Sequence, residues 1–100
     1  MRIREHKETK TNNMKIIKKK IHPEYFDAVA SGKKCYEFRV ADFNVAEGDV
    51  LVLQEWDPSE KKYTGRELQK KISYVGKFTL DSFGQREALE KNGFYILSLE

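Results

Sequence analysis

The sequence predicts an α+β fold: a small mixed β-barrel with one short helix capping an opening. The first observation behind this prediction is the element order, which reads strand, helix, three strands, a short helical or irregular segment, and a last strand. The second is Val50–Leu53, which is apolar at four consecutive positions, as in a strand buried on both faces. The third is that only residues 23–31 show a clear amphipathic helical stripe. One such helix against five strands favours a barrel.

The first two predicted elements carry clear start and stop signals. An isoleucine-rich run among lysines over residues 14–21 lacks helical spacing and predicts an edge-like strand with its lysines outward. Pro23 suits the first turn of a helix. Gly32 suits the position after the helix end, because glycine adopts positive φ without a Cβ clash.

The rest of the chain alternates turns with apolar runs. We expect a strand over 35–40, a tight turn at 47–49 and a central strand over 50–56. A long exposed hairpin over 57–66 should lead into a strand over 67–78. The chain should end with a weakly structured or helical piece over 80–92, closed by Gly93, and a last strand over 94–99. Phe78, Phe94 and Tyr95 are assigned to the core. Short connections favour antiparallel pairing of the three middle strands.

Charge divides the chain into two parts. Residues 1–20 hold eight basic and two acidic side chains, whereas residues 21–100 hold eleven basic and fourteen acidic ones. Residues 1–13 lack apolar periodicity and are predicted to form a disordered basic N-terminal extension, and residues 14–100 to form the domain. Such an extension attracts phosphates or simply aids solubility.

The composition disfavours metal and cofactor sites, a membrane span and a secretory signal. Cys35 has no cysteine partner, and His6 lies far from His22, so neither a metal site nor a cofactor is predicted. No run approaches the roughly 20 apolar residues of a membrane span. The start of the chain has no signal-type apolar stretch, so we expect no membrane partner and a cytoplasmic location.

The chemistry of the chain concentrates in residues 31–39. In the predicted strand 35–40, Cys35, Glu37 and Arg39 should point one way, while Tyr36, Phe38 and Val40 pack on the other. Lys34 could reach the side of Glu37 if the strand opens with a bend. The group could hold an anion, a nucleobase edge or a carboxamide. It could equally be a surface ion pair.

Two motifs resemble a known family. Gly32-x-Lys34-x-x-Glu37-x-Arg39 and Val45-x-x-Gly48-Asp49-x-Leu51-x-Leu53 are similar to the ASCH domain of the PUA-like superfamily of small β-barrels. Residues 93–99 look like its closing strand, and residues 63–67 look like a hairpin of a compact bacterial and phage branch. The resemblance covers residues 14–100. It implies a cleft between helix and barrel that suits RNA or a nucleotide.

The same resemblance raises an enzymatic alternative. The family contains an amidohydrolase of N4-acetylcytidine with catalytic lysine, threonine and glutamate residues. Its lysine matches Lys34, but its threonine position falls on Glu37, and its glutamate could be Glu87 or Glu90. If the chain is an enzyme, Lys34 and Glu37 would be catalytic, with glutamate directing a water.

The predicted ligand-binding set extends beyond the central stretch; it comprises Lys34, Glu37, Arg39, Asp42, Trp56, Tyr63 and Arg66. Arginine binds phosphate or carboxylate in a bidentate manner, and Asp42 could orient Arg39 or simply turn the chain. Trp56 is either a core residue or a base-stacking platform. Tyr63 and Arg66 offer a second contact to RNA backbone. His22 could cap the helix or face the cleft.

The sequence is therefore compatible with three functions. The first is an RNA- or nucleotide-binding module, the second an amidohydrolase of an N-acylated nucleoside, and the third a phage-related protein-interaction module. The sequence does not identify a protein partner.

Overall fold

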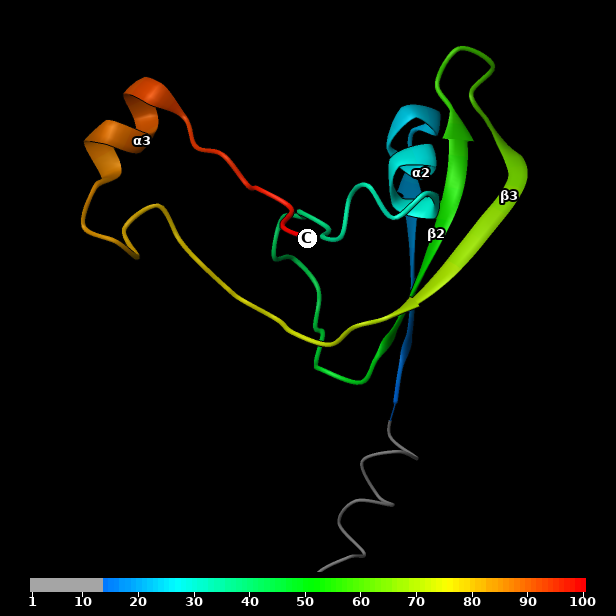
Figure 1. Cartoon of the computed structure of the whole chain (residues 1–100), viewed down its shortest axis with the longest axis horizontal. Coiled ribbons are helices and arrows are strands. Elements are labelled where there is room, and N and C mark those ends of the chain that lie inside the picture. The colour runs from blue at the N-terminus through cyan, green and yellow to red at the C-terminus, as the bar shows by residue number, and fades with distance from the viewer. Residues whose placement is uncertain (1–13) are drawn as a thin grey trace, which may run out of the picture.

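The computed structural model describes residues 14–100 and has an α+β fold, as predicted. Figure 1 shows its elements, which are β1 (Ile16–Ile21), α2 (Pro23–Ala30), β2 (Val50–Asp57), β3 (Lys62–Lys71) and α3 (Arg86–Asn92). The predicted disordered extension, residues 1–13, lies outside the described residues.

The three strands form one sheet in the order β1-β2-β3. β1 is parallel to β2, with Ile16 opposite Val50, and β2 is antiparallel to β3. The prediction of a central, doubly buried strand is confirmed, because Leu51, Val52 and Leu53 expose only 8%, 4% and 1% of their surface. Burial on both faces explains why this run lacks polar alternation.

The hairpin between β2 and β3 is tighter than predicted. The Asp57 carboxylate accepts hydrogen bonds from the main-chain N–H groups of Ser59 and Glu60, and the Asp57 carbonyl accepts one from Lys61. These bonds close the turn within residues 57–61, so β3 begins at Lys62. The predicted boundaries, a hairpin over 57–66 and a strand over 67–78, are therefore wrong.

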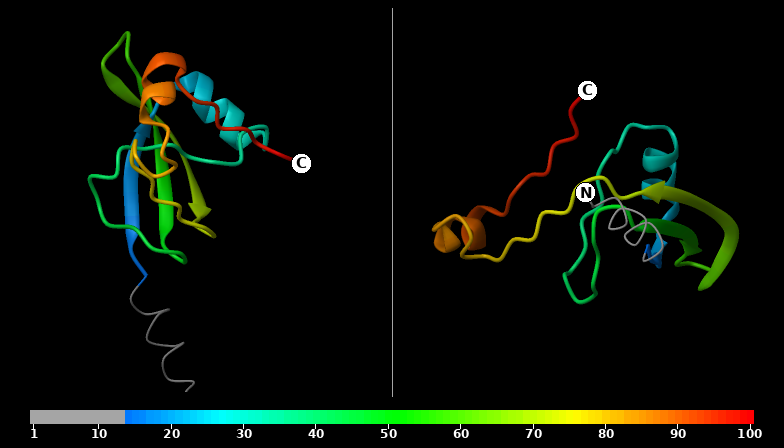
Figure 2. Two further views of the ribbon diagram at one scale, coloured as in Figure 1. Left: turned by 90° about the vertical axis from the view of Figure 1, so that its left-hand side faces the viewer. Right: turned by 90° about the horizontal axis from the view of Figure 1, so that it is seen from below.

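Helix α2 packs on one face of the sheet (Figure 2). Phe26 and Val29 join Ile21, Leu51 and Leu53 in the hydrophobic core. The predicted helix end is confirmed: Gly32 has a φ of 81°, and the N–H of Lys34 donates to the Ala28 carbonyl at 2.9 Å. This αL turn redirects the chain from the helix towards residues 34–39.

Asp49 ties the beginnings of β1 and β2 together. Its nearly buried carboxylate accepts hydrogen bonds from the main-chain N–H groups of Lys15, at 3.0 Å, and Ala46, at 2.9 Å. These two bonds, that of Lys15 first, lower the pKa of Asp49 below its ordinary value. Its main chain also pairs with Ile72, because the Ile72 N–H donates to the Asp49 carbonyl. The turn predicted at 47–49 therefore holds the beginnings of β1 and β2 and the end of β3 next to one another.

Two predicted strands, residues 35–40 and 94–99, are irregular. The sheet of the described residues is open and three-stranded, so neither segment has a ladder partner. After β3 the chain leaves the sheet, and Figures 1 and 2 show α3 standing apart from α2. Side chains assigned to packing are consequently exposed: Phe38 61%, Val40 78%, Phe78 61%, Phe94 55% and Tyr95 90%. Those assignments are wrong.

The helical segment expected within residues 80–92 is confirmed as α3. Gly93 follows it with a φ of 72°, and its N–H donates to the Leu89 carbonyl at 2.8 Å. None of the described helices is long and apolar enough to cross a membrane. Within residues 14–100, no group of three or more His, Cys, Asp or Glu side chains is placed to hold a metal ion.

Gly32→Val is expected to lower the free energy of unfolding by about 1–2 kcal/mol, because the left-handed conformation is strained for residues with a Cβ. A Cβ at Gly32 would meet no heavy atom within 4 Å, so the loss is conformational and not steric. Urea denaturation measures it. Gly32→Asn is the control, since asparagine tolerates positive φ. Equal losses for both variants would contradict this explanation.

Candidate functional site

An open pocket of about 710 Å³ is formed by the end of β1, the start of α2 and the irregular segment after α2. Trp56 from β2, with Phe94 and Ile96 from the C-terminal segment, completes its lining. Four residues predicted from the sequence line it: Lys34, Glu37, Arg39 and Trp56. Three charged residues of the stretch 31–39 therefore lie together in one pocket, next to Trp56.

Glu37 is the centre of the polar groups in this pocket. Lys34 Nζ donates to its Oε1 at 3.2 Å, and Arg39 Nε donates to its Oε2 at 2.6 Å. The predicted reach of Lys34 to Glu37 is thus confirmed. The Arg39 guanidinium also donates from Nη2 to the Lys20 carbonyl at 2.6 Å. These contacts anchor an otherwise irregular segment to the end of β1.

Aromatic rings surround the cations of the pocket. Lys34 Nζ lies 4.7 Å from the Tyr36 ring centroid and 6.0 Å from that of Tyr25. Lys20 Nζ lies 3.8 Å from the Trp56 ring centroid, and Tyr63 meets Trp56 edge-on at 5.0 Å. Such arrangements are favourable because the face of an aromatic ring attracts a cation.

Lys20, His22, Tyr25 and Tyr36 also line the pocket, although the sequence analysis did not assign them to the binding set. Lys20 was interpreted as an outward lysine of an edge strand. Its position at the end of the strand, three residues before Pro23, was the missed signal, since the strand end and the helix start share one end of the sheet. His22 precedes the helix without a side-chain cap hydrogen bond and faces the pocket.

Three residues of the predicted binding set do not line the pocket: Asp42, Tyr63 and Arg66. Arg39 is held by Glu37 and the Lys20 carbonyl, while the Asp42 N–H donates to the Val40 carbonyl in a turn. Tyr63 supports Trp56 from the side. Asp42 therefore turns the chain, and the prediction that it orients Arg39 is not supported by these contacts.

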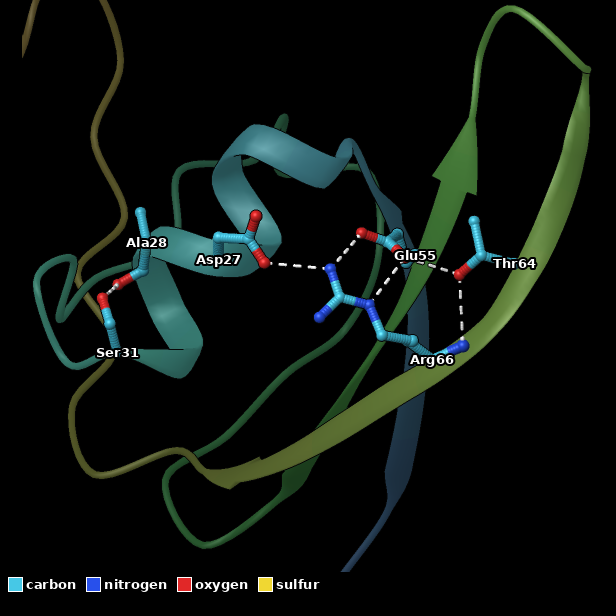
Figure 3. A network of polar contacts seen from close by, with 6 residues as sticks. All are labelled: Asp27, Ala28, Ser31, Glu55, Thr64 and Arg66. Atoms are coloured by element: carbon cyan, nitrogen blue, oxygen red, sulfur yellow. Dashed lines mark hydrogen bonds and ion pairs between the residues drawn. The ribbon is translucent and has the colours of Figure 1, made fainter.

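Arg66 instead neutralises a nearly buried carboxylate, Glu55 of the central strand (Figure 3). Its Nε and Nη2 donate to the two Glu55 oxygens at 2.9 and 2.7 Å. Nη2 also donates to Asp27 of α2 at 2.9 Å, and the guanidinium carbon lies 4.4 Å from the Phe26 ring centroid. Thr64 Oγ1 donates to Glu55 at 2.6 Å. The group ties α2 to both strands of the hairpin.

Ionisation in this network follows from the contacts. The hydrogen bonds from Arg66 and then Thr64 hold the pKa of Glu55 below its ordinary value. The reciprocal bond from Arg66 to Glu55 raises the pKa of the guanidinium, so both groups are charged at neutral pH. Glu55 was not predicted from the sequence. The signal was a carboxylate within a strand predicted to be central, because a buried charge requires a partner.

The two alternative acids of the enzymatic hypothesis lie elsewhere. Glu87 and Glu90 belong to α3, and neither lines the pocket that contains Lys34. Glu90 pairs with Arg86 of its own helix at 3.4 Å. The pocket is therefore lined by cations, aromatic rings and one paired carboxylate. These groups are complementary to an anionic ligand that carries a flat ring.

Comparison with known proteins identifies a family. The family described as a domain of unknown function (DUF3850) matches residues 16–98, which is most of the chain. The chain belongs to the DUF3850 family. A relative described as an uncharacterized 12.9 kDa protein in the GpA 3′ region, from Escherichia phage P2, is 44% identical over 61 residues. That match covers 61% of this DUF3850 chain and 54% of the phage protein, so the chain spans about half the length of that relative.

Arg66→Lys is expected to lower Tm by roughly 5–10 °C, because lysine cannot hold both Glu55 oxygens and Asp27 at once. Thermal unfolding followed by circular dichroism measures the shift.

Arg86→Lys is the matched control for this change. Arg86 makes a similar two-point contact with Asp81, at 2.7 and 3.0 Å, but both partners are exposed. We expect it to shift Tm by less than about 2 °C. Comparable shifts in the two variants would show that burial of Glu55 is not the source of the effect.

Proposed function

We propose that this DUF3850 chain is an RNA- or nucleotide-binding module whose ligand enters the pocket lined by Lys34, Glu37, Arg39 and Trp56. The observation that carries the proposal is the convergence of these four side chains, from two separate segments, on one open pocket. Nucleotides combine an anion with an aromatic base. A pocket with cations beside aromatic rings is complementary to both parts.

The charge of the pocket supports the same ligand class. Three permanent cations line it, namely Lys20, Lys34 and Arg39, against the single carboxylate of Glu37. The excess positive charge favours an anion. Both Glu37 oxygens accept hydrogen bonds from cations, an arrangement that supports binding over hydrolysis. The amidohydrolase alternative gains no specific observation from the described residues.

A closer structural relationship is part of the proposal. We infer that the chain is related to the ASCH domain and that residues 35–40 and 94–99 pair to close a PUA-like barrel. Two contacts support this: the Cys35 N–H donates to Ser98 Oγ at 3.2 Å, and Phe38 meets Phe94 at 5.4 Å. Both segments alternate apolar and polar residues only in part. A cytoplasmic site of action is also part of the proposal.

A second candidate function is protein interaction, and the exposed C-terminal segment favours it. Tyr95, Leu97 and Leu99 expose 90%, 72% and 85% of their surface. Large apolar side chains gathered on one exposed segment are typical of interaction sites. The similarity to a phage protein agrees with the phage-related interaction module expected from the sequence.

Lys34→Ala and Arg39→Ala are each expected to weaken binding of a labelled single-stranded RNA by about tenfold or more, because each removes a charge-assisted contact. The free energy of unfolding should change by less than about 1 kcal/mol, since partly exposed ion pairs contribute little. Fluorescence anisotropy at two salt concentrations measures binding, and the salt slope should decrease with each lost cation.

Lys33→Ala is the control for these variants. It removes the same charge one residue away, but Lys33 is exposed and does not line the pocket. Glu37→Gln should retain most of the affinity, since the amide oxygen still accepts a hydrogen bond. If Lys33→Ala weakens RNA as much as Lys34→Ala does, the attraction is diffuse and the pocket is not the site. Turnover of N4-acetylcytidine that Glu37→Gln abolishes would favour the enzymatic alternative.

Hydrogen exchange is expected to distinguish a closed barrel from an open C-terminal segment that binds a protein partner. A closed barrel gives the amides of 35–40 and 94–99 partners, so their exchange should slow by about 100-fold or more relative to unstructured peptides. Residues 50–57 serve as the protected internal reference. Rapid exchange at both segments would contradict barrel closure and favour the interaction module.

A further inference from the structure

Lys20 differs from the other cations of the pocket in its partners. Within residues 14–100 its ammonium contacts no carboxylate, and its neighbours are the rings of Trp56, at 3.8 Å, and Tyr63, at 5.8 Å. By contrast, Lys34 and Arg39 both bind Glu37, at 3.2 and 2.6 Å. An incoming anion can therefore pair with Lys20 without breaking an existing ion pair.

Arg39, which lines the same pocket, supplies a second donor and is bound to the main chain of Lys20. Its Nη2 donates to the Lys20 carbonyl at 2.6 Å, and its Nε is taken by Glu37. Nη1 has no hydrogen-bond partner among the described residues. The guanidinium is thus held against the main chain of Lys20, and Nη1 can still donate to one oxygen of an anion.

The aromatic rings near Lys20 indicate which chemical group of the ligand is attached to the anion. Lys20 lies opposite Gln54 in the parallel ladder, which brings its side chain to the part of β2 that carries Trp56. Tyr63 braces Trp56 edge-on at 5.0 Å. Tyr63 is itself held opposite Trp56 by the hairpin register. A group attached to an anion at Lys20 would lie next to Trp56 and Tyr63, and bases stack on aromatic side chains.

We propose that Lys20 is the phosphate-binding residue of this pocket and that the pocket takes a nucleoside monophosphate unit. The phosphate lies between the Lys20 ammonium and Arg39 Nη1, and the base lies against the aromatic side chains beside them. The unit is either a free mononucleotide or one residue of an RNA strand. This inference rests on the proposed function and adds to it the position and chemistry of the anion.

The sole tryptophan of the sequence gives a local readout, since Trp56 lines the pocket. The experiment titrates the full chain with uridine, uridine 5′-monophosphate and a short oligouridylate, following Trp56 emission and, independently, calorimetry. The monophosphate is expected to bind about tenfold tighter than uridine. Lys20→Ala should weaken binding of the monophosphate far more than binding of uridine and so remove that preference, whereas Lys20→Arg should retain it.

Lys18→Ala is the matched control, because Lys18 is an exposed lysine of the same strand, two residues earlier, and does not line the pocket. Unchanged affinity for all three probes in this variant supports the assignment. Thermal melts of each variant exclude misfolding as a cause.

The arms of the experiment separate the two hypotheses. Equal affinity for uridine and its monophosphate, or equal losses in Lys20→Ala and Lys18→Ala, would overturn the role of Lys20 while pocket-dependent RNA binding could stand. Preference for the oligouridylate over the monophosphate identifies the strand as the source of the phosphate and supports the proposal. If no probe binds, the proposed function and this inference both fail.

Discussion

The pairing of Glu55 with Arg66 is the interaction on which the arrangement of this domain depends. A carboxylate that is only 4% exposed on the central strand would be strongly destabilising without a partner. Arg66 neutralises it from the neighbouring strand and, with the same guanidinium, binds Asp27 and covers the Phe26 ring. One side chain therefore fixes the hairpin and the helix together. Because Tyr25 precedes Phe26 on that helix, the same contact positions one wall of the pocket.

The opposite wall is held by polar contacts rather than by a ladder. Residues 34–39 form no regular strand, and they are fixed by Glu37 between Lys34 and Arg39 and by the tie from Arg39 to the end of β1. Binding segments commonly have this construction, in which an irregular loop is positioned by a rigid scaffold. Under the proposed function, a ligand contact made by Lys34 would compete with its ion pair to Glu37, whereas Arg39 could bind the ligand through Nη1 and keep Glu37 on Nε.

The sequence was informative wherever local chemistry decides the structure. The proline and glycine bounding α2, the doubly apolar run of β2, and the reach of Lys34 to Glu37 were all predicted, because each depends on a few neighbouring residues. Pairing over long distances was not predictable in this way. The segments 35–40 and 94–99 have the composition of strands, but composition cannot show which edge, if any, they join. Arg66 was predicted to bind a ligand because its hairpin was expected to be exposed. Nothing local in the sequence indicates that Arg66 faces the buried Glu55.

A comparison of the two glutamate centres supports a structural role for Glu55 and agrees with the site proposed around Glu37. At Glu55 a two-point contact with Arg66, a hydroxyl and near-complete burial leave no capacity for a ligand. At Glu37 a single carboxylate serves two cations, and a third cation, Lys20, stands beside aromatic rings without a carboxylate among the described residues. Balanced charge stabilises a fold, whereas excess charge next to an open pocket is retained at some cost in stability. The imbalance around Glu37, more than the identity of any one residue, is what favours an anionic ligand there.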